Sequence, residues 1–122
     1  MPIAIWGGRH ILRNPSNRAI SDYLGISGER KGGKLYDVAV VGAGPAGLAA
    51  AVYAASEGLS TLVLDCRAFG GQAGASARIE NYMGFPTGIS GIALMARAQN
   101  QALKFGAEMA IPDEVISLRR ST

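Results

Sequence analysis

The sequence predicts an α/β fold, in which a Rossmann-type parallel sheet with helices on both faces is preceded by a small β-β-α unit. Short β-branched runs alternate with longer helical stretches from residue 36 onward, which is the pattern of a parallel sheet. The segment Ser27–Lys34 is rich in glycine and charge and contains no apolar side chain, so it marks a linker between the two units. With 48% hydrophobic and 17% charged residues, the 122-residue chain can bury a core.

The small β-β-α unit is expected over residues 1–26. Its predicted elements are strands at Ile3–Trp6 and His10–Arg13, a turn at Gly7-Gly8 and a following helix with Ala19, Ile20, Tyr23 and Leu24 on its apolar face. Asn14 is expected to cap this helix, with Pro15 at the first helical position and Gly25 after its end. A unit of this size buries too little surface to be stable alone.

The parallel sheet is expected over residues 36–122, after a linker over 27–35. Its predicted elements are a strand over 36–41, a helix over 45–57, a strand over 61–64, a helix from about 90 to 105, and strands over 108–111 and 115–118. The apolar residues expected to share one face of the sheet are Val38, Val40, Leu62 and Leu64.

Composition and charge argue against several classes of protein. No apolar run approaches the ~18 residues that a membrane-spanning helix needs, so no membrane association is expected. The net charge of +3 comes from basic residues scattered over the first 35 positions, which does not indicate nucleic-acid binding. Cys66 is the only cysteine and no secretory signal pattern is visible, so a cytoplasmic location is expected.

The strongest motif is the glycine-rich turn between the first parallel strand and its helix, at residues 42–47. Gly42 allows the tight turn, Gly44 lets a pyrophosphate approach the backbone, and Gly47 permits close packing of helix on strand. The amino end of the helix offers free N–H groups and a partial positive charge to phosphates. Asp65 ends the second strand about 20 residues further on, where a carboxylate accepts hydrogen bonds from ribose hydroxyls. The combination predicts a dinucleotide site.

The order of these motifs resembles the low-molecular-weight thioredoxin reductase family of pyridine nucleotide-disulfide oxidoreductases. GAGPAG at 42–47, Asp65, GGQ at 70–72 and ENYMGFP at 80–86 carry the resemblance, which covers residues 36–115. It implies that the dinucleotide is FAD. The turn and the acidic residue would hold the ADP half, GGQ would pass near the pyrophosphate and ribityl group, and the asparagine would lie near the flavin ring. The implied binding residues are Gly42, Ala43, Gly44, Pro45, Ala46, Gly47, Asp65, Gly70, Gly71, Gln72 and Asn81.

The amino-terminal unit resembles the last third of a thioredoxin or glutaredoxin fold. A proline before a short strand, a hairpin and the run Leu12–Ser16 before an amphipathic helix carry this resemblance. Pro2 would take the place of the cis-proline, and the dithiol half of such a fold is absent from the chain.

Family features that the chain lacks limit the function expected of it. The NADPH domain and the CxxC of the resembled family are both missing, and no catalytic residue or metal ligand is identified. Cys66 is expected to be a small buried residue with no redox role. The chain is therefore expected to be a truncated FAD-binding segment that is inactive alone. The alternatives are a non-catalytic nucleotide-binding or interaction remnant, and a half-enzyme that needs a separate chain with the NADPH domain. Self-association is also expected.

Overall fold

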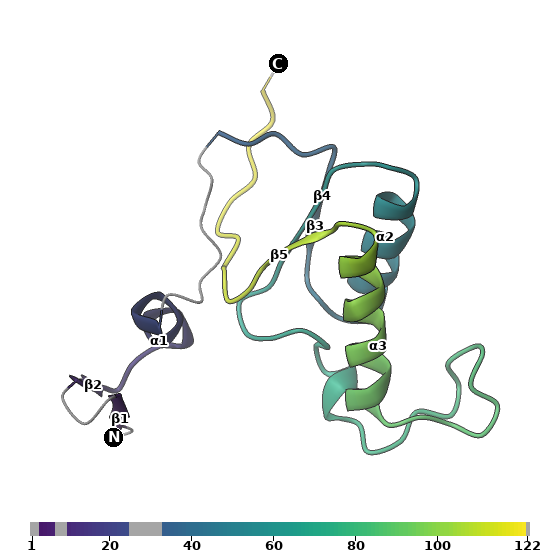
Figure 1. The fold of residues 1–122 in the computed structure, drawn as a ribbon, viewed down its shortest axis with the longest axis horizontal. Helices are drawn as coiled ribbons and strands as arrows, with labels where there is room; N and C mark the ends of the chain where they lie inside the picture. Colours follow the sequence, from purple (N-terminus) through teal and green to yellow (C-terminus); the bar gives the residue numbers. More distant parts are fainter. Residues whose placement is uncertain (1–2, 7–9, 25–32, 122) are drawn as a thin grey trace.

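The computed structural model describes residues 3–6, 10–24 and 33–121 (Figure 1). The elements of the amino-terminal unit are β1 (Ile3–Trp6), β2 (His10–Arg13) and α1 (Asn17–Leu24). β1 and β2 pair antiparallel, as the predicted hairpin requires. The predicted positions at Pro2, Gly7-Gly8 and Gly25, and residues 27–32 of the predicted linker, lie outside the described residues.

Helix α1 begins two residues later than the sequence predicts. The Ser16 hydroxyl accepts a hydrogen bond from the Ala19 amide at 3.1 Å, and the Ser16 carbonyl accepts one from Ile20 at 3.0 Å. Ser16 is therefore the cap, and the prediction that Asn14 caps the helix is wrong. Asn14 instead has a φ of 47° and turns the chain out of β2, a backbone conformation that asparagine tolerates better than most residues.

The larger unit is a three-stranded parallel sheet with the strand order β3-β4-β5. Its elements are β3 (Val38–Val41), α2 (Pro45–Ser56), β4 (Thr61–Leu64), the 3-10 helix η1 (Ala73–Ala75), α3 (Gly91–Lys104) and β5 (Glu108–Ala110). The predicted Rossmann-type α/β fold, with a small antiparallel unit before it, is confirmed.

Helices α2 and α3 pack side by side on one face of this sheet (Figure 1). A right-handed crossover places its helix on a face that depends on the direction in which the chain crosses the sheet. The chain passes from β3 to β4 to β5 in a single direction, so both crossovers fall on the same side. Within the described residues the opposite face carries no helix, which differs from the expectation of helices on both faces.

The strand register decides which apolar residues lie beneath the helices. Val40 lies opposite Val63, and Val63 is fully buried. Successive side chains alternate between the two faces, so Leu62 and Leu64 lie on the opposite face from Val63. The prediction that they share a face with Val38 and Val40 is therefore wrong. The buried apolar core consists of Ala43, Leu48, Ala51, Ala55, Val63, Leu94, Met95, Ala102 and Ala107.

The last predicted strand, residues 115–118, is also absent from the structure, where this segment has no regular secondary structure. Ile116 is 88% exposed and Leu118 is 95% exposed. Val115, Ile116 and Ser117 line a cavity of about 770 Å³ together with Leu62 and Leu64. A β-branched run forms a strand only beside a partner strand, and this run has none within the described part of the chain.

Candidate functional site

The glycine-rich turn that joins β3 to α2 is tightly packed. Gly42 has a φ of 105°, and its amide donates to the Leu64 carbonyl at 2.7 Å. A Cβ on Gly47 would lie 1.9 Å from the Gly42 carbonyl oxygen. No larger residue fits at that position without moving the backbone, because real side chains do not approach so closely. Gly42 therefore makes the tight turn, and Gly47 lets the start of α2 pack closely against the turn and β3.

The amino end of α2 has no side-chain cap. Gly44 precedes the helix in an extended conformation, Pro45 occupies its first turn, and no side chain caps the terminus. The first intrahelical hydrogen bond runs from the Leu48 amide to the Gly44 carbonyl at 2.9 Å. The amides of the first turn and the helix dipole are thus available to an anion.

Gly70 and Gly71 lie directly against this turn. The Gly70 amide donates to the Ala43 carbonyl at 2.6 Å, and a Cβ on Gly71 would lie 3.2 Å from the Gly44 Cα. Both glycines have positive φ angles, 102° and 53°. Two glycine segments that are distant in sequence therefore meet backbone to backbone beside an uncapped helix end. This arrangement fits a pyrophosphate, which needs a close approach to the main chain.

Asp65 links the end of β4 to the glycine turn. Its Oδ2 accepts from the Ala43 amide at 2.8 Å and its Oδ1 accepts from the Arg67 amide at 2.9 Å. Its own amide donates to the Ala110 carbonyl at 3.3 Å, and its carbonyl accepts from the Asp113 amide at 2.7 Å. A carboxylate has about four lone-pair sites, so Asp65 retains acceptor capacity for hydroxyl groups of a ligand.

Asn81 is the predicted site residue that the structure does not join to the others. It is exposed, on a loop closed by an antiparallel bridge between Ile79 and Ile89. This loop projects beyond the amino end of α3 (Figure 1). In the described part of the chain, no hydrogen bond or ion pair connects Asn81 to the glycine turn. Gln72 is exposed at the start of η1, directly after Gly71.

Helix α3 supports the second glycine segment, a role that sequence reasoning missed. A Cβ on Gly70 would lie 3.0 Å from the Met95 side chain, which is 1% exposed. A Cβ on Gly91 would lie 1.9 Å from the Ala73 carbonyl oxygen, so α3 begins in contact with η1. The signal in the sequence is Gly91 directly after the cap Ser90, whose hydroxyl accepts from the Ala93 amide.

The described residues also bear on three other expectations, for the cysteine, for a metal site and for a membrane helix. Cys66 is exposed, so the prediction that it is buried is wrong. Among the described residues, no group of three or more His, Cys, Asp or Glu side chains is placed to hold a metal ion. None of the helices in the described ranges is long and apolar enough to cross a membrane.

Comparisons with known proteins identify a family for this chain. Residues 37–113 match the family model described as FAD dependent oxidoreductase. The "Bifunctional thioredoxin reductase/thioredoxin" of Mycobacterium leprae is 46% identical over 86 residues, which are 70% of this chain and 19% of that protein. The "NADPH-dependent thioredoxin reductase 3" of Arabidopsis thaliana is 36% identical over 130 residues, covering 95% of this chain and 24% of that protein. The chain thus spans about a fifth to a quarter of the length of these two relatives.

Solved structures give the same result. The crystal structure of T. acidophilum thioredoxin reductase superposes with a TM-score of 0.65 at 38% identity, covering 70% of this chain and 28% of that one. Lactococcus lactis thioredoxin reductase superposes with a TM-score of 0.58 at 39% identity, covering 62% of this chain and 25% of that one. Both likenesses cover a minor part of the larger protein.

Proposed function

Since the chain belongs to the FAD dependent oxidoreductase family, we propose that its glycine turn and Asp65 hold the ADP half of FAD in a thioredoxin-reductase-like oxidoreductase. FAD binding is implied by the family and by the thioredoxin reductase relatives. The observation that carries the assignment of residues is the meeting of Gly44 and Gly71 at the uncapped end of α2. A pyrophosphate placed there receives backbone N–H groups and the positive end of the helix dipole.

The proposed binding residues divide according to the part of the cofactor that each would contact. The pyrophosphate would lie against Gly42, Ala43, Gly44, Pro45, Ala46, Gly47, Gly70, Gly71 and Gln72. Asp65 would accept hydrogen bonds from the adenosine ribose, at a position where a negative charge also disfavours a 2′-phosphate. Asn81 remains a predicted contact of the flavin ring.

The chain's part in a redox reaction would be to bind and orient the cofactor. FAD, when bound, accepts and passes on the electrons. We propose a reaction from NADPH to a disulfide, as the names of the relatives suggest. The 122 residues contain one cysteine and therefore no dithiol. The NADPH site and the dithiol would lie outside these 122 residues. A reducing cytoplasm is the compartment we propose, because of the single cysteine.

The test is retention of flavin by the purified chain. The 122-residue protein is incubated with FAD, passed through a gel-filtration column and examined for flavin absorbance in the protein peak. The matched control is Gly44→Val, whose side chain would project toward Gly71 and fill the space proposed for the pyrophosphate. We expect flavin with the unmodified chain and none with the folded variant. Equal flavin in both peaks, or no flavin in either, would contradict the assignment.

A further inference from the structure

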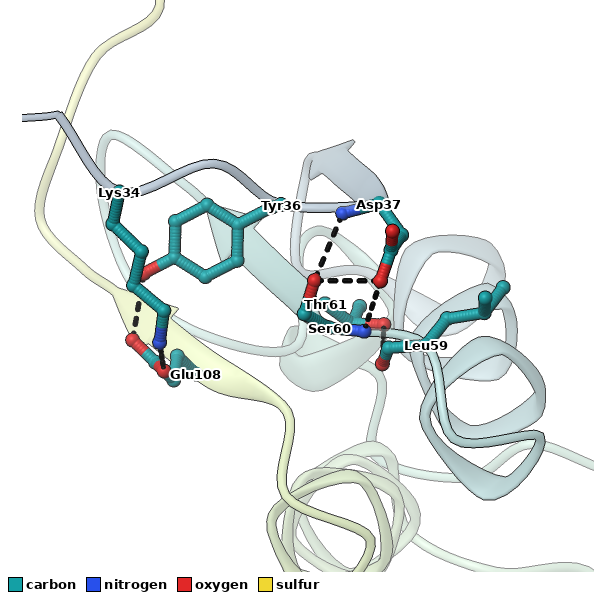
Figure 2. Close-up of polar contacts among 7 residues, drawn as sticks. All are labelled: Lys34, Tyr36, Asp37, Leu59, Ser60, Thr61 and Glu108. Carbon is teal, nitrogen blue, oxygen red and sulfur yellow. Dashed lines mark hydrogen bonds and ion pairs between the residues drawn. The ribbon is translucent and has the colours of Figure 1, made fainter.

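A side-chain cluster at the amino end of the sheet ties β5 to the residues before β3 (Figure 2). Tyr36 donates from its hydroxyl to the Glu108 Oε2 at 2.7 Å, and the Lys34 ammonium forms an ion pair with the Glu108 Oε1. The Lys34 ammonium also lies 4.8 Å from the centre of the Tyr36 ring. β4 separates these two edges of the sheet, so the cluster connects strands that do not pair with each other.

Lys34 and Tyr36 are both protonated where they contact the Glu108 carboxylate, which stabilises this cluster. The hydrogen bond to Glu108 raises the pKa of the Lys34 ammonium and that of the Tyr36 hydroxyl. Each group therefore keeps its proton beside the carboxylate at neutral pH. The Lys34 and Glu108 side chains are 38% and 48% exposed, so solvent weakens the ion pair. The hydrogen bond from the uncharged Tyr36 hydroxyl to the Glu108 carboxylate is less sensitive to salt than the ion pair.

The other end of β5 holds the backbone of Asp65. Ala110, the last residue of the strand, accepts from the Asp65 amide, and Asp113 donates to the Asp65 carbonyl. β5 is three residues long and pairs with one strand, β4, within the described residues. A strand so short on a sheet edge has few backbone hydrogen bonds, so side-chain contacts at its first residue add to what holds it.

We propose that Glu108 is a positioning residue for the dinucleotide site: by anchoring the amino end of β5, it keeps Ala110 and Asp113 where they hold Asp65. This inference rests on the proposed function, because it assigns Asp65 to the adenosine ribose. Its contacts with Lys34 and Tyr36 lie at the opposite end of β5 from Asp65, so Glu108 would act through the strand that it begins. Removing the Glu108 carboxylate should therefore weaken nucleotide binding by no more than the loss of the Asp65 side chain does.

A double-mutant cycle on the 122-residue chain tests the proposal. ADP affinity is measured by calorimetry for the unmodified chain, Glu108→Ala, Asp65→Ala and the double variant. We expect Glu108→Ala to weaken ADP binding about three- to tenfold in the unmodified background. Because the effects of coupled residues are not additive, the effect should depend on whether Asp65 is present. In the Asp65→Ala background the same change should have no effect. Glu108→Gln, which can still accept from Tyr36, should recover part of the affinity.

Hydrogen exchange on the same variants separates positioning from general loss of structure. The amides of Asp65 and Asp113 should exchange faster in Glu108→Ala, whereas the Leu48 amide in α2 should not change. Glu57→Gln removes an exposed negative charge at the end of α2 and should change neither exchange nor ADP affinity.

Three results would overturn the proposal. They are unchanged ADP affinity in Glu108→Ala, an equal loss in both backgrounds of the cycle, and faster exchange throughout the chain. An unmodified chain that binds no ADP would overturn the proposed function and this inference together. The first three results leave the proposed function standing.

Discussion

Two glycines of the turn differ in what a side chain would meet. At Gly44 the nearest atom to an added Cβ is the Gly71 Cα at 4.0 Å, which is ordinary contact. At Gly47 the nearest atom is the Gly42 carbonyl oxygen at 1.9 Å, and the Val40 side chain follows at 3.2 Å. The first position can therefore accept a methyl group in the absence of a ligand, while the second cannot.

We predict that Gly47→Ala destabilises the fold and Gly44→Ala does not. Overpacking of this kind costs about 1–3 kcal/mol, a large share of the ~5–15 kcal/mol that keeps a domain folded. Thermal melts followed by circular dichroism give the comparison. Identical melting temperatures for Gly47→Ala and the unmodified chain would show that the packing of α2 on β3 is looser than described.

Asp65 has a structural role in addition to its proposed role in binding. Asp65→Ala would leave the amide of Ala43, a fully buried residue, without its acceptor. Leaving a buried donor unsatisfied costs about 1–3 kcal/mol. We therefore predict lower resistance to urea even without nucleotide, and partial recovery in Asp65→Asn, whose amide oxygen can still accept. Unfolding curves that coincide for Asp65→Ala and the unmodified chain would contradict this role.

The roles of the turn glycines could be predicted from sequence, but the contacts of Asp65 could not. Gly42 and Gly47 lie in a local motif whose spacing specifies a strand, a turn and a helix. The bond from Ala43 to Asp65, in contrast, depends on how closely β3 and β4 approach. The contact of Gly91 with Ala73 is hidden from sequence reasoning for the same reason, since it joins segments that no local pattern connects.

At the scale of elements, a polar network fastens the amino ends of β3 and β4 (Figure 2). The Asp37 carboxylate accepts from the Ser60 hydroxyl at 2.7 Å and from the Ser60 amide at 2.8 Å. The Asp37 amide donates to the Ser60 hydroxyl oxygen at 2.9 Å. The bonds from the Ser60 side chain and backbone lower the pKa of Asp37.

This network predicts a dependence of stability on acid. Because the pKa of Asp37 is lower in the folded chain, its contribution is fully present above the unfolded pKa of about 4 and is lost as the pH falls through the folded value. Asp37→Asn should therefore show a flatter fall in the free energy of unfolding below about pH 4. Urea unfolding measured at several pH values would reveal it. The same acid slope in both proteins would exclude this contribution.

Most helices and strands could be predicted from the local sequence pattern. The register of the strands and the neighbour of each strand could not. α2 and α3 agree with the prediction to within one residue at each end. Pro45 begins α2 and the cap Ser90 precedes α3, while Gly58 and Gly106 follow their carboxyl ends. The expected strand at 115–118 is absent because a strand requires a neighbour. The single face expected for Val40 and Leu62 is wrong because local sequence does not fix how β3 pairs with β4.

At the scale of the whole molecule, the helix-free face of the sheet is only partly covered. Leu62 and Leu64 line a cavity of about 770 Å³, and Ile116 and Leu118 beside it are almost fully exposed. Each large apolar side chain left in water forgoes about 1.5–3 kcal/mol of burial. The 122-residue chain is therefore expected to self-associate and to melt at low temperature.

Sedimentation velocity over a range of concentrations measures that association. The variant Ile116→Lys/Leu118→Lys should shift the chain toward monomer without loss of helix content. Glu57→Lys, at the end of α2, should leave the self-association unchanged. An unmodified chain that stays monomeric at all concentrations, with a cooperative melt at high temperature, would show that the face needs no cover.

The same chain is expected to show no NADPH-dependent disulfide reduction. One cysteine cannot form the dithiol that would pass two electrons to a disulfide. The assay contains NADPH, added FAD and a generic disulfide, and it is compared with free FAD. Turnover well above that comparison would show that the 122 residues are sufficient for the reaction.

The choice of ligand by the unmodified chain tests the proposed site most directly. Equilibrium titrations with FAD, ADP, FMN and NADP compare molecules that share different parts of the cofactor. Because all the proposed contacts except Asn81 lie on the ADP half, FAD and ADP should bind with similar affinity, and FMN and NADP should bind at least about tenfold more weakly. FMN binding as tightly as FAD, or NADP binding more tightly than FAD, would contradict the assignment of this site to the ADP half of FAD.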